Sequence, residues 1–264
     1  MDLGTERLIG RKDGAIGWMI FNNPERRNAV STDMWQAIPG VLEAFEADPE
    51  VRVVVFTGAG DKAFVSGADI SQFEDVRANR EANEVYSAQS AAANRAMTRL
   101  SKPSIAMIKG YCIGGGMAVA LTCDMRVCSD DSRFAIPAAR LGLGYGYDGL
   151  KALADVVGPS FAKEILFTAR QLNAAEALRI GLVNKVVPAA ELEAAVRDYA
   201  AMIGRNAPLT VKAAKMAVRE AMKDPERREL DEVAKAVGAC FESADYAEGR
   251  KAFMEKRDPV FQGK

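Results

Sequence analysis

Short apolar runs and a helical apolar stripe alternate along the first part of the chain. Residues 15–21 and 51–56 form runs whose pattern favours strands. Between them Ser31 offers an N-cap, and apolar residues then recur at helical spacing, at Trp35, Ile38, Val41, Leu42 and Phe45. The pattern predicts a strand, an amphipathic helix and a second strand in succession.

The middle of the chain continues this alternation. Residues 104–108 and 124–128 are expected to be strands on either side of a glycine turn with a short helix. Residues 71–80 are polar and irregular, and they predict a mobile flap. The helix expected after the flap carries an apolar stripe that ends at Lys102-Pro103, and its members are Val85, Ala88, Ala92, Ala96 and Leu100. Strands that alternate with helices favour the α/β class.

Helices dominate the pattern from Asn173 onward. The segment Asn173-Ala-Ala-Glu176 resembles a capping box. Two later helices are expected to carry one apolar face each, with Leu209, Ala213 and Met216 on the first and Leu230, Val233, Val237 and Phe241 on the second. With 264 residues, 49% of them hydrophobic, the chain is long enough to bury one full core.

The charge balance excludes several classes of partner. Lys and Arg number 35 and Asp and Glu number 36, so the net charge of −1 gives no long-range field that attracts nucleic acid. The longest apolar stretch, residues 111–123, is shorter than the ~20 residues of a membrane-spanning helix. Acidic residues stand near the N-terminus, where a signal peptide has a basic segment. We therefore expect a cytoplasmic protein that binds neither nucleic acid nor membrane.

The chain contains 0 histidines. This removes the commonest general base and metal ligand, and it excludes Ser-His and Cys-His nucleophile pairs. The 4 cysteines form no C-x-x-C pair, so reduced thiols are expected and no metal site is. The chemistry must come from other groups.

Two glycine-containing turns supply a candidate for that chemistry. Ser66-Gly67-Ala68 and Gly114-Gly115-Gly116 each follow a β-type run, at a place where a helix can begin. Together they can present two backbone N–H groups to one oxygen, which is an oxyanion hole built without side chains. The alternative is that the glycines only allow helix and strand backbones to approach closely.

Three segments around these turns, residues 62–70, 108–120 and 123–127, resemble the crotonase (enoyl-CoA hydratase/isomerase) superfamily. The resemblance extends over nearly the whole chain. It implies a spiral of ββα units in a core domain, residues 1–200, and a C-terminal helical region, residues 201–264, that packs trimers or a dimer of trimers. It also implies an acyl-CoA thioester substrate, with coenzyme A as part of that substrate and no separate cofactor.

The resemblance also assigns individual residues. The N–H groups of Ala68 and Gly115 would donate to the thioester oxygen, and the same Ala68 would line the CoA site with Lys62, Ser66 and Ile70. Lys256 and Phe261 match the C-terminal stretch that reaches the CoA phosphates or adenine, in some members from a neighbouring subunit. For Lys256 a solvated helix end is the alternative.

Two positions depart from the pattern of the hydratases. In those enzymes two glutamates activate water and deliver a proton, whereas this chain has Ala118 and Ala138 at the matching places. Alanine cannot transfer a proton, and losing general acid–base help typically costs about 10²–10⁴-fold per group. Hydration by the usual glutamate pair is therefore in doubt.

Two nearby residues offer protons instead. The segment Leu141-Gly-Leu-Gly-Tyr145 is similar to one in methylmalonyl-CoA decarboxylases of the superfamily, where a tyrosine points at the substrate carboxylate, and Asp148 follows it. The alternatives are a packing role for Tyr145 and a turn or cap role for Asp148.

Three interpretations therefore stay open. They are an enoyl-CoA hydratase/isomerase, a malonyl-type acyl-CoA decarboxylase, and an acyl-CoA-binding homologue without catalysis. A nicotinamide oxidoreductase built on Thr57-Gly-Ala-Gly60 is a poor competitor, because Ala63 stands where the third glycine of the dinucleotide motif belongs.

Overall fold

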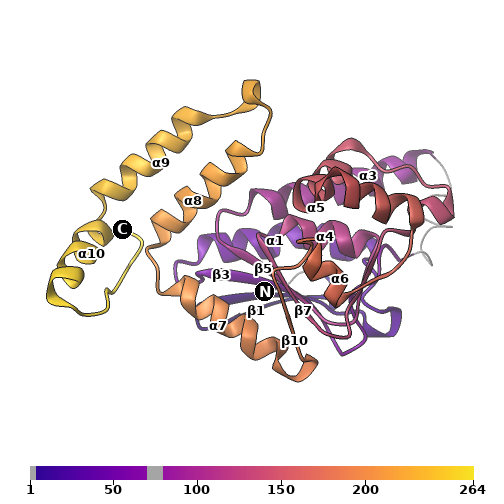
Figure 1. Ribbon diagram of the computed structural model, residues 1–264, viewed down its shortest axis with the longest axis horizontal. Helices are drawn as coiled ribbons and strands as arrows, with labels where there is room; N and C mark the ends of the chain where they lie inside the picture. The colour runs from indigo at the N-terminus through magenta and orange to yellow at the C-terminus, as the bar shows by residue number, and fades with distance from the viewer. Residues whose placement is uncertain (1–3, 70–79) are drawn as a thin grey trace.

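The computed structural model describes residues 4–69 and 80–264, in which the strands form two sheets (Figure 1). The larger sheet has the order β1-β2-β3-β5-β7-β10 and the smaller one the order β4-β6-β8-β9. β1 pairs antiparallel with β2 and β8 with β9, and the other neighbours pair in parallel. The strand bounds are β1 Leu8–Asp13, β2 Ile16–Phe21, β3 Val53–Gly58, β4 Ala63–Val65, β5 Ser104–Ile108, β6 Tyr111–Ile113, β7 Met125–Ser129, β8 Arg133–Ala135, β9 Leu172–Asn173 and β10 Lys185–Val187.

The α-helices pack around these sheets and continue beyond them. Their bounds are α1 Thr32–Ala47, α3 Arg80–Arg99, α4 Gly115–Thr122, α5 Tyr147–Thr168, α6 Ala174–Arg179, α7 Leu192–Gly204, α8 Pro208–Ala221, α9 Leu230–Glu242 and α10 Ala244–Glu255. Short 3-10 helices are η1 Pro24–Arg26, η3 Pro137–Leu141, η4 Ala189–Glu191 and η5 Pro225–Arg227. Among the described residues, no helix is both long and apolar enough to cross a membrane.

The chain repeats one unit as it passes between the sheets. β3, β5 and β7 lie in the larger sheet, and each is followed by a strand of the smaller sheet, β4, β6 and β8 respectively. A helix then completes each unit: α3, α4 and α5. These are the expected ββα units. Because β6 ends only two residues before α4 begins, the N-terminus of α4 lies beside the end of a strand of the smaller sheet.

The larger sheet is buried on both faces. Along β3, Val53 and Val55 point into a cluster with α7, while Val54 and Phe56 belong to the main cluster on the opposite face. This is the side-chain alternation of a strand covered on both sides. Each such side chain contributes about 1.5–3 kcal/mol when fully buried. The main cluster underlies α1, α3 and α4 and so supports the glycine turns.

Several local predictions are confirmed. α1 begins directly after Ser31, and its buried residues include the five apolar positions expected from the sequence. The capping box at α6 is present, because the Glu176 N–H donates to Asn173 Oδ1 and the Asn173 N–H donates to Glu176 Oε2, each at 2.9 Å. Residues 71–79 of the predicted flap lie outside the described residues, as does Ile70, and its last residue, Arg80, begins α3.

The predicted stripe of α3 is wrong in its first half. Val85 is exposed, and the residues that pack into the core are Ala93, Met97 and Leu100. The spacing 93, 97, 100 is also a helical face, rotated from the predicted one. Alanines at many positions of this helix made several faces look equally apolar, and packing against α1 selects the one that carries Met97.

The C-terminal helices extend away from the sheets. Figure 1 shows α8, α9 and α10 side by side, in orange to yellow, at one end of the molecule. They line an apolar cavity of about 710 Å³, and two of the side chains that line it are largely exposed, Phe241 at 62% and Phe253 at 82%. A single chain therefore leaves this apolar surface uncovered.

Candidate functional site

The first glycine turn presents the N–H of Ala68. The turn follows β4, and Ala68 forms an isolated parallel bridge with Val30. In this bridge the Val30 N–H donates to Gly67 O at 2.8 Å and the Asp69 N–H donates to Val30 O at 3.1 Å. These bonds use the groups on either side of Ala68, so the N–H of Ala68 points away from Val30.

The second turn places Gly115 beside that same peptide. A Cβ built on Gly115 would lie 3.5 Å from the Ala68 nitrogen and 3.4 Å from the Gly67 carbonyl carbon. Gly115 is the first residue of α4, and the N–H groups of a first helical turn have no partner within the helix. Two backbone donors from distant parts of the sequence therefore lie next to each other, at the positive end of a helix.

Neighbouring glycines make this approach possible. A Cβ built on Gly116 would lie 2.0 Å from Val65 O, closer than any side chain allows. Gly114, the N-cap, has φ 55 and ψ −112, a conformation that favours glycine. The close-approach interpretation of the glycines thus holds at Gly116, and it brings Gly115 to the peptide of Ala68.

Asn28 links three backbone segments that precede the first glycine turn. No role was assigned to this residue from the sequence. Its fully buried side chain donates to Ala59 O at 2.9 Å and Ala63 O at 2.7 Å, and its Oδ1 accepts from the Asn23 N–H at 3.0 Å. These bonds hold the loop before β4. The sequence alone contains no signal for this role, because the three carbonyl and amide partners of Asn28 come together only in the folded chain.

Tyr145 lies over the second turn. Its hydroxyl oxygen is 3.9 Å from a Cβ built on Gly114, and its ring packs against the main core cluster. Burial raises the pKa of the Tyr145 hydroxyl, which therefore stays protonated at neutral pH and can donate a proton or a hydrogen bond. Asp148, by contrast, is exposed in the first turn of α5.

The two alanines that replace glutamates flank the same turn. Ala118 lies half-buried on α4, and its N–H donates to Gly114 O at 3.2 Å. Ala138 is 7% exposed in η3, whose first residue, Pro137, has its Cδ 4.0 Å from a Cβ built on Gly114. Neither supplies a titratable group.

The residues matched to the CoA site fall into two places. Lys62 is exposed just before β4, and the Ser66 hydroxyl donates to Arg26 O at 3.2 Å, so both lie near the first turn. Lys256 is the C-cap of α10, and Phe261 packs on Gly249 of that helix. Figure 1 shows α10 at one end of the molecule, well separated from α4 in the core, so one chain does not bring Lys256 and Phe261 to the glycine turns.

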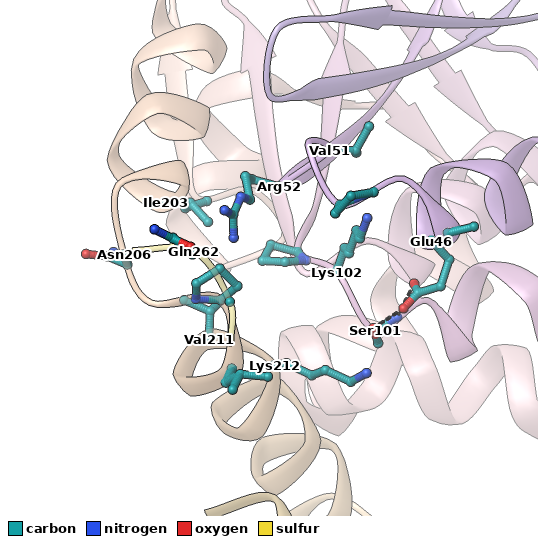
Figure 2. Close-up of a pocket in the computed structure, with 16 residues that line it drawn as sticks. Glu46, Val51, Arg52, Ser101, Lys102, Ile203, Asn206, Val211, Lys212 and Gln262 are labelled. Atoms are coloured by element: carbon teal, nitrogen blue, oxygen red, sulfur yellow. Dashed lines mark hydrogen bonds between the residues drawn. The ribbon is translucent and has the colours of Figure 1, made fainter. Parts of the chain in front are cut away.

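A cavity of about 240 Å³ lies at the junction of the core with α8 (Figure 2). It is lined by Arg52 and Pro103, which precede β3 and β5, by Pro208 of α8, and by Gln262 and Gly263. This cavity lies at the amino ends of β3 and β5, whereas the glycine turns follow β4 and β6, which come after the carboxyl ends of those two strands. None of the predicted site residues lines it.

Comparisons with known proteins agree with this geometry. The family model described as Enoyl-CoA hydratase/isomerase matches residues 11–264. A crotonyl-CoA hydratase of Syntrophomonas wolfei is 38% identical over 262 residues, which cover 99% of this chain and 100% of the relative. A short-chain-enoyl-CoA hydratase of Clostridium acetobutylicum is 37% identical over 250 residues, 95% of each chain.

The fold agrees as well. The crystal structure of an enoyl-CoA hydratase/carnithine racemase from Magnetospirillum magneticum superimposes with a TM-score of 0.91 at 35% identity, covering 98% of this chain and 97% of that one. The expected crotonase fold, with two mixed sheets and C-terminal helices, is confirmed, and so is the expectation of an enzyme from a family of lyases. The chain belongs to the enoyl-CoA hydratase/isomerase family, the crotonase superfamily.

Proposed function

We propose that this chain is an acyl-CoA thioester enzyme that stabilises an enolate at the N–H groups of Ala68 and Gly115. The observation that carries the proposal is the contact between the two turns, in which the backbone of Gly115 lies beside the peptide nitrogen of Ala68. Two N–H donors aimed at one oxygen stabilise the charge that develops there, and the N-terminus of α4 adds a favourable dipole. Lys62 and Ser66 beside the first turn would contact the CoA part of the substrate.

The relatives' names favour the chemistry of enoyl-CoA hydratases and isomerases for this site. In that chemistry a proton is added or removed next to the thioester carbonyl, and the enolate is the intermediate state that the oxyanion site stabilises. With Ala118 and Ala138 in place of the glutamates, Tyr145 and Asp148 are the residues we propose for proton transfer. Tyr145 is the better placed of the two, because its hydroxyl lies over Gly114.

The position of Tyr145 also favours a second candidate, decarboxylation of a malonyl-type acyl-CoA. In that reaction the bond between Cα and the carboxylate breaks, its electron pair passes to the thioester oxygen, and CO₂ leaves. The enolate forms directly, so no base is needed. A proton from Tyr145 or Asp148 to Cα completes the step. An oxyanion hole and one proton donor suffice for this chemistry.

A screen of thioesters tests the proposal in two measurements. Saturating acyl-CoA should raise the melting temperature by about 5 °C or more, because ligand that binds only the folded state stabilises it, whereas the free acids should not. Mass spectrometry after incubation with enoyl-, 3-hydroxyacyl- and malonyl-type CoA esters should find turnover of at least one. A thermal shift without turnover of any ester would favour the non-catalytic homologue. A shift with NADH alone would favour the dinucleotide interpretation.

We also propose that the chain forms a trimer or a dimer of trimers through residues 201–264. The support is the uncovered apolar surface of α8, α9 and α10, which includes Leu230, Phe241 and Phe253. A neighbouring subunit would cover it and could bring Lys256 and Phe261 to a CoA site that they do not reach within one chain. Light scattering coupled to gel filtration should give three or six times the mass of 28.4 kDa. A monomer at all concentrations would contradict the proposal. It would also leave the assignment of Lys256 and Phe261 to a CoA site without support.

A further inference from the structure

Arg126 on β7 is a buried cation that the proposed chemistry does not yet use. It is 6% exposed, and its guanidinium donates to three backbone carbonyls: Nε to Leu182 O at 2.7 Å, and Nη1 to Cys123 O at 2.8 Å and Ala120 O at 3.3 Å. Burial lowers the pKa of Arg126, but a guanidinium titrates so far above neutrality that it stays charged.

No carboxylate forms an ion pair with Arg126 within the part of the chain that the structure describes. The nearest acid in sequence, Asp124, is engaged elsewhere: its Oδ2 accepts from the Ser104 N–H at 2.7 Å and from Lys215 Nζ at 2.8 Å. The neighbouring side chains Cys112 and Cys123 are buried thiols, and burial raises the pKa of both, that of Cys123 to about 12, so they are neutral. Among the described residues the guanidinium of Arg126 therefore donates its hydrogen bonds to backbone carbonyls, and Asp124 acts on it as a nearby negative charge without a direct contact.

Two of the three carbonyls belong to the C-terminal end of α4. Ala120 lies in the last turn of the helix, and Cys123 is its C-cap. The last carbonyls of a helix lack intrahelical partners and carry its partial negative charge. The other end of α4 begins at Gly115. A helix of 8 residues is about 12 Å long. Arg126 therefore binds carbonyls at the C-terminal end of α4, about 12 Å from the N-terminal end that we propose to contact the thioester oxygen.

We propose that Arg126 is a positioning residue for the oxyanion site, which fixes α4 and makes its N-terminal end more positive. The inference rests on the proposed function above. The cation at the C-terminal end of α4 favours negative charge at the thioester oxygen near the N-terminal end. That negative charge is larger in the enolate than in the ground state. Loss of the cation should therefore lower kcat more than it raises KM. At about 12 Å and an effective dielectric constant of about 20, the charge alone corresponds to about a tenfold effect.

A purely structural role would affect stability without affecting the polarity of the bound carbonyl. The two roles can be separated with butyryl-CoA labelled with ¹³C at the thioester carbonyl, a saturated ligand that cannot be hydrated. Infrared difference spectra of the bound ester report how strongly the carbonyl is polarised. The wild-type chain should shift the carbonyl stretch to lower frequency, as an oxyanion site requires. The melting temperature and the circular dichroism of each variant report its folding.

The variants differ in charge and in hydrogen bonding. Arg126→Met and Arg126→Gln remove the charge but keep both N–H donors, so the carbonyl shift should become smaller, with kcat on the ester found active lowered about tenfold. Arg126→Lys keeps the charge and should retain most of the shift. The control is Arg133→Met: Arg133 on β8 also donates to carbonyls, of Asp131 at 3.1 Å and Ser132 at 3.0 Å, but these belong to a surface turn. This variant should keep the full shift.

The outcomes distinguish the inference from the proposed function. Butyryl-CoA that binds the wild-type chain without a carbonyl shift would overturn the oxyanion proposal and this inference with it. A carbonyl shift of the same size in the wild-type chain and in the folded neutral variants would overturn this inference but leave the oxyanion proposal intact. Should both neutral variants fail to fold, Arg126→Lys decides the question. Retention of the shift, with faster hydrogen exchange in α4, supports the inference, whereas loss of the shift with unchanged exchange contradicts it.

Discussion

Replacing Gly115 by proline is expected to lower the turnover of the active thioester about 10²–10³-fold, because proline has no N–H and deletes one of the two oxyanion donors. The helix itself should survive. Gly115 is the first residue of α4, and proline is well tolerated at that position, where the lost N–H has no partner within the helix. Steady-state kinetics on the ester identified by the screen measure the effect, and the melting temperature checks that the variant folds.

Gly115→Ala is the matched control for this change. It keeps the N–H, and its Cβ would lie 3.4 Å from the Gly67 carbonyl carbon and 3.5 Å from the Ala68 nitrogen. These are ordinary contact distances, so a smaller loss is expected than for proline. Equal losses in the two variants would attribute the effect to crowding and would contradict the role of Gly115 as a donor.

Hydration of crotonyl-CoA by the native chain is expected to be slow, and Ala118→Glu combined with Ala138→Glu is expected to raise it by about 10²-fold or more. Each glutamate restores a general acid or base, which typically contributes about 10²–10⁴-fold. Both alanines flank the glycine turn, from α4 and from η3, so both carboxylates would be close to the bound thioester. The loss of absorbance of the enoyl thioester measures the rate, and the two substitutions should act as a unit rather than additively.

Ala139→Glu is the control for this experiment. Ala139 is exposed in the same short helix as Ala138, so a glutamate there adds the same charge on the solvent side and should leave hydration slow. The outcome that contradicts the argument is fast crotonyl-CoA hydration by the native chain. It would mean that Tyr145, Asp148 or another group performs the work of the glutamates.

Four strands of the larger sheet, β2, β3, β5 and β7, and the first helix could be predicted from the sequence because their signals are local, whereas β1 and β10 were not predicted. β2 and β3 are runs of six residues, and α1 carries its cap and its apolar face within one segment. The smaller sheet was not predicted as a sheet. β4, β6 and β8 are three residues each, too short for an alternation to be recognised, and their pairing depends on the spiral path of the chain.

The candidate site also has a part that the sequence indicates, the glycine turns, and a part that it does not, the placement of the side chains. The glycine turns could be recognised in the sequence, because glycine is the residue that allows two backbones to approach as closely as those of Gly116 and Val65 do. The side chains were harder to place: Tyr145 and Asp148 are three residues apart, yet one lies over the turn and the other faces solvent. Arg126 was visible in the sequence, but its role depends on carbonyls of α4 and of residue 182, which only the folded chain brings together.

The bridge between Val30 and Ala68 has a consequence for how this site can vary. The donor that we propose at residue 68 is a backbone group, so its chemistry does not depend on which side chain residue 68 carries. It does depend on register, because successive N–H groups along a strand point in opposite directions. Inserting or deleting one residue between Val65 and Ala68 would turn the donor toward Val30 and aim a carbonyl at the substrate. The site therefore tolerates substitution at this position far better than a change in loop length.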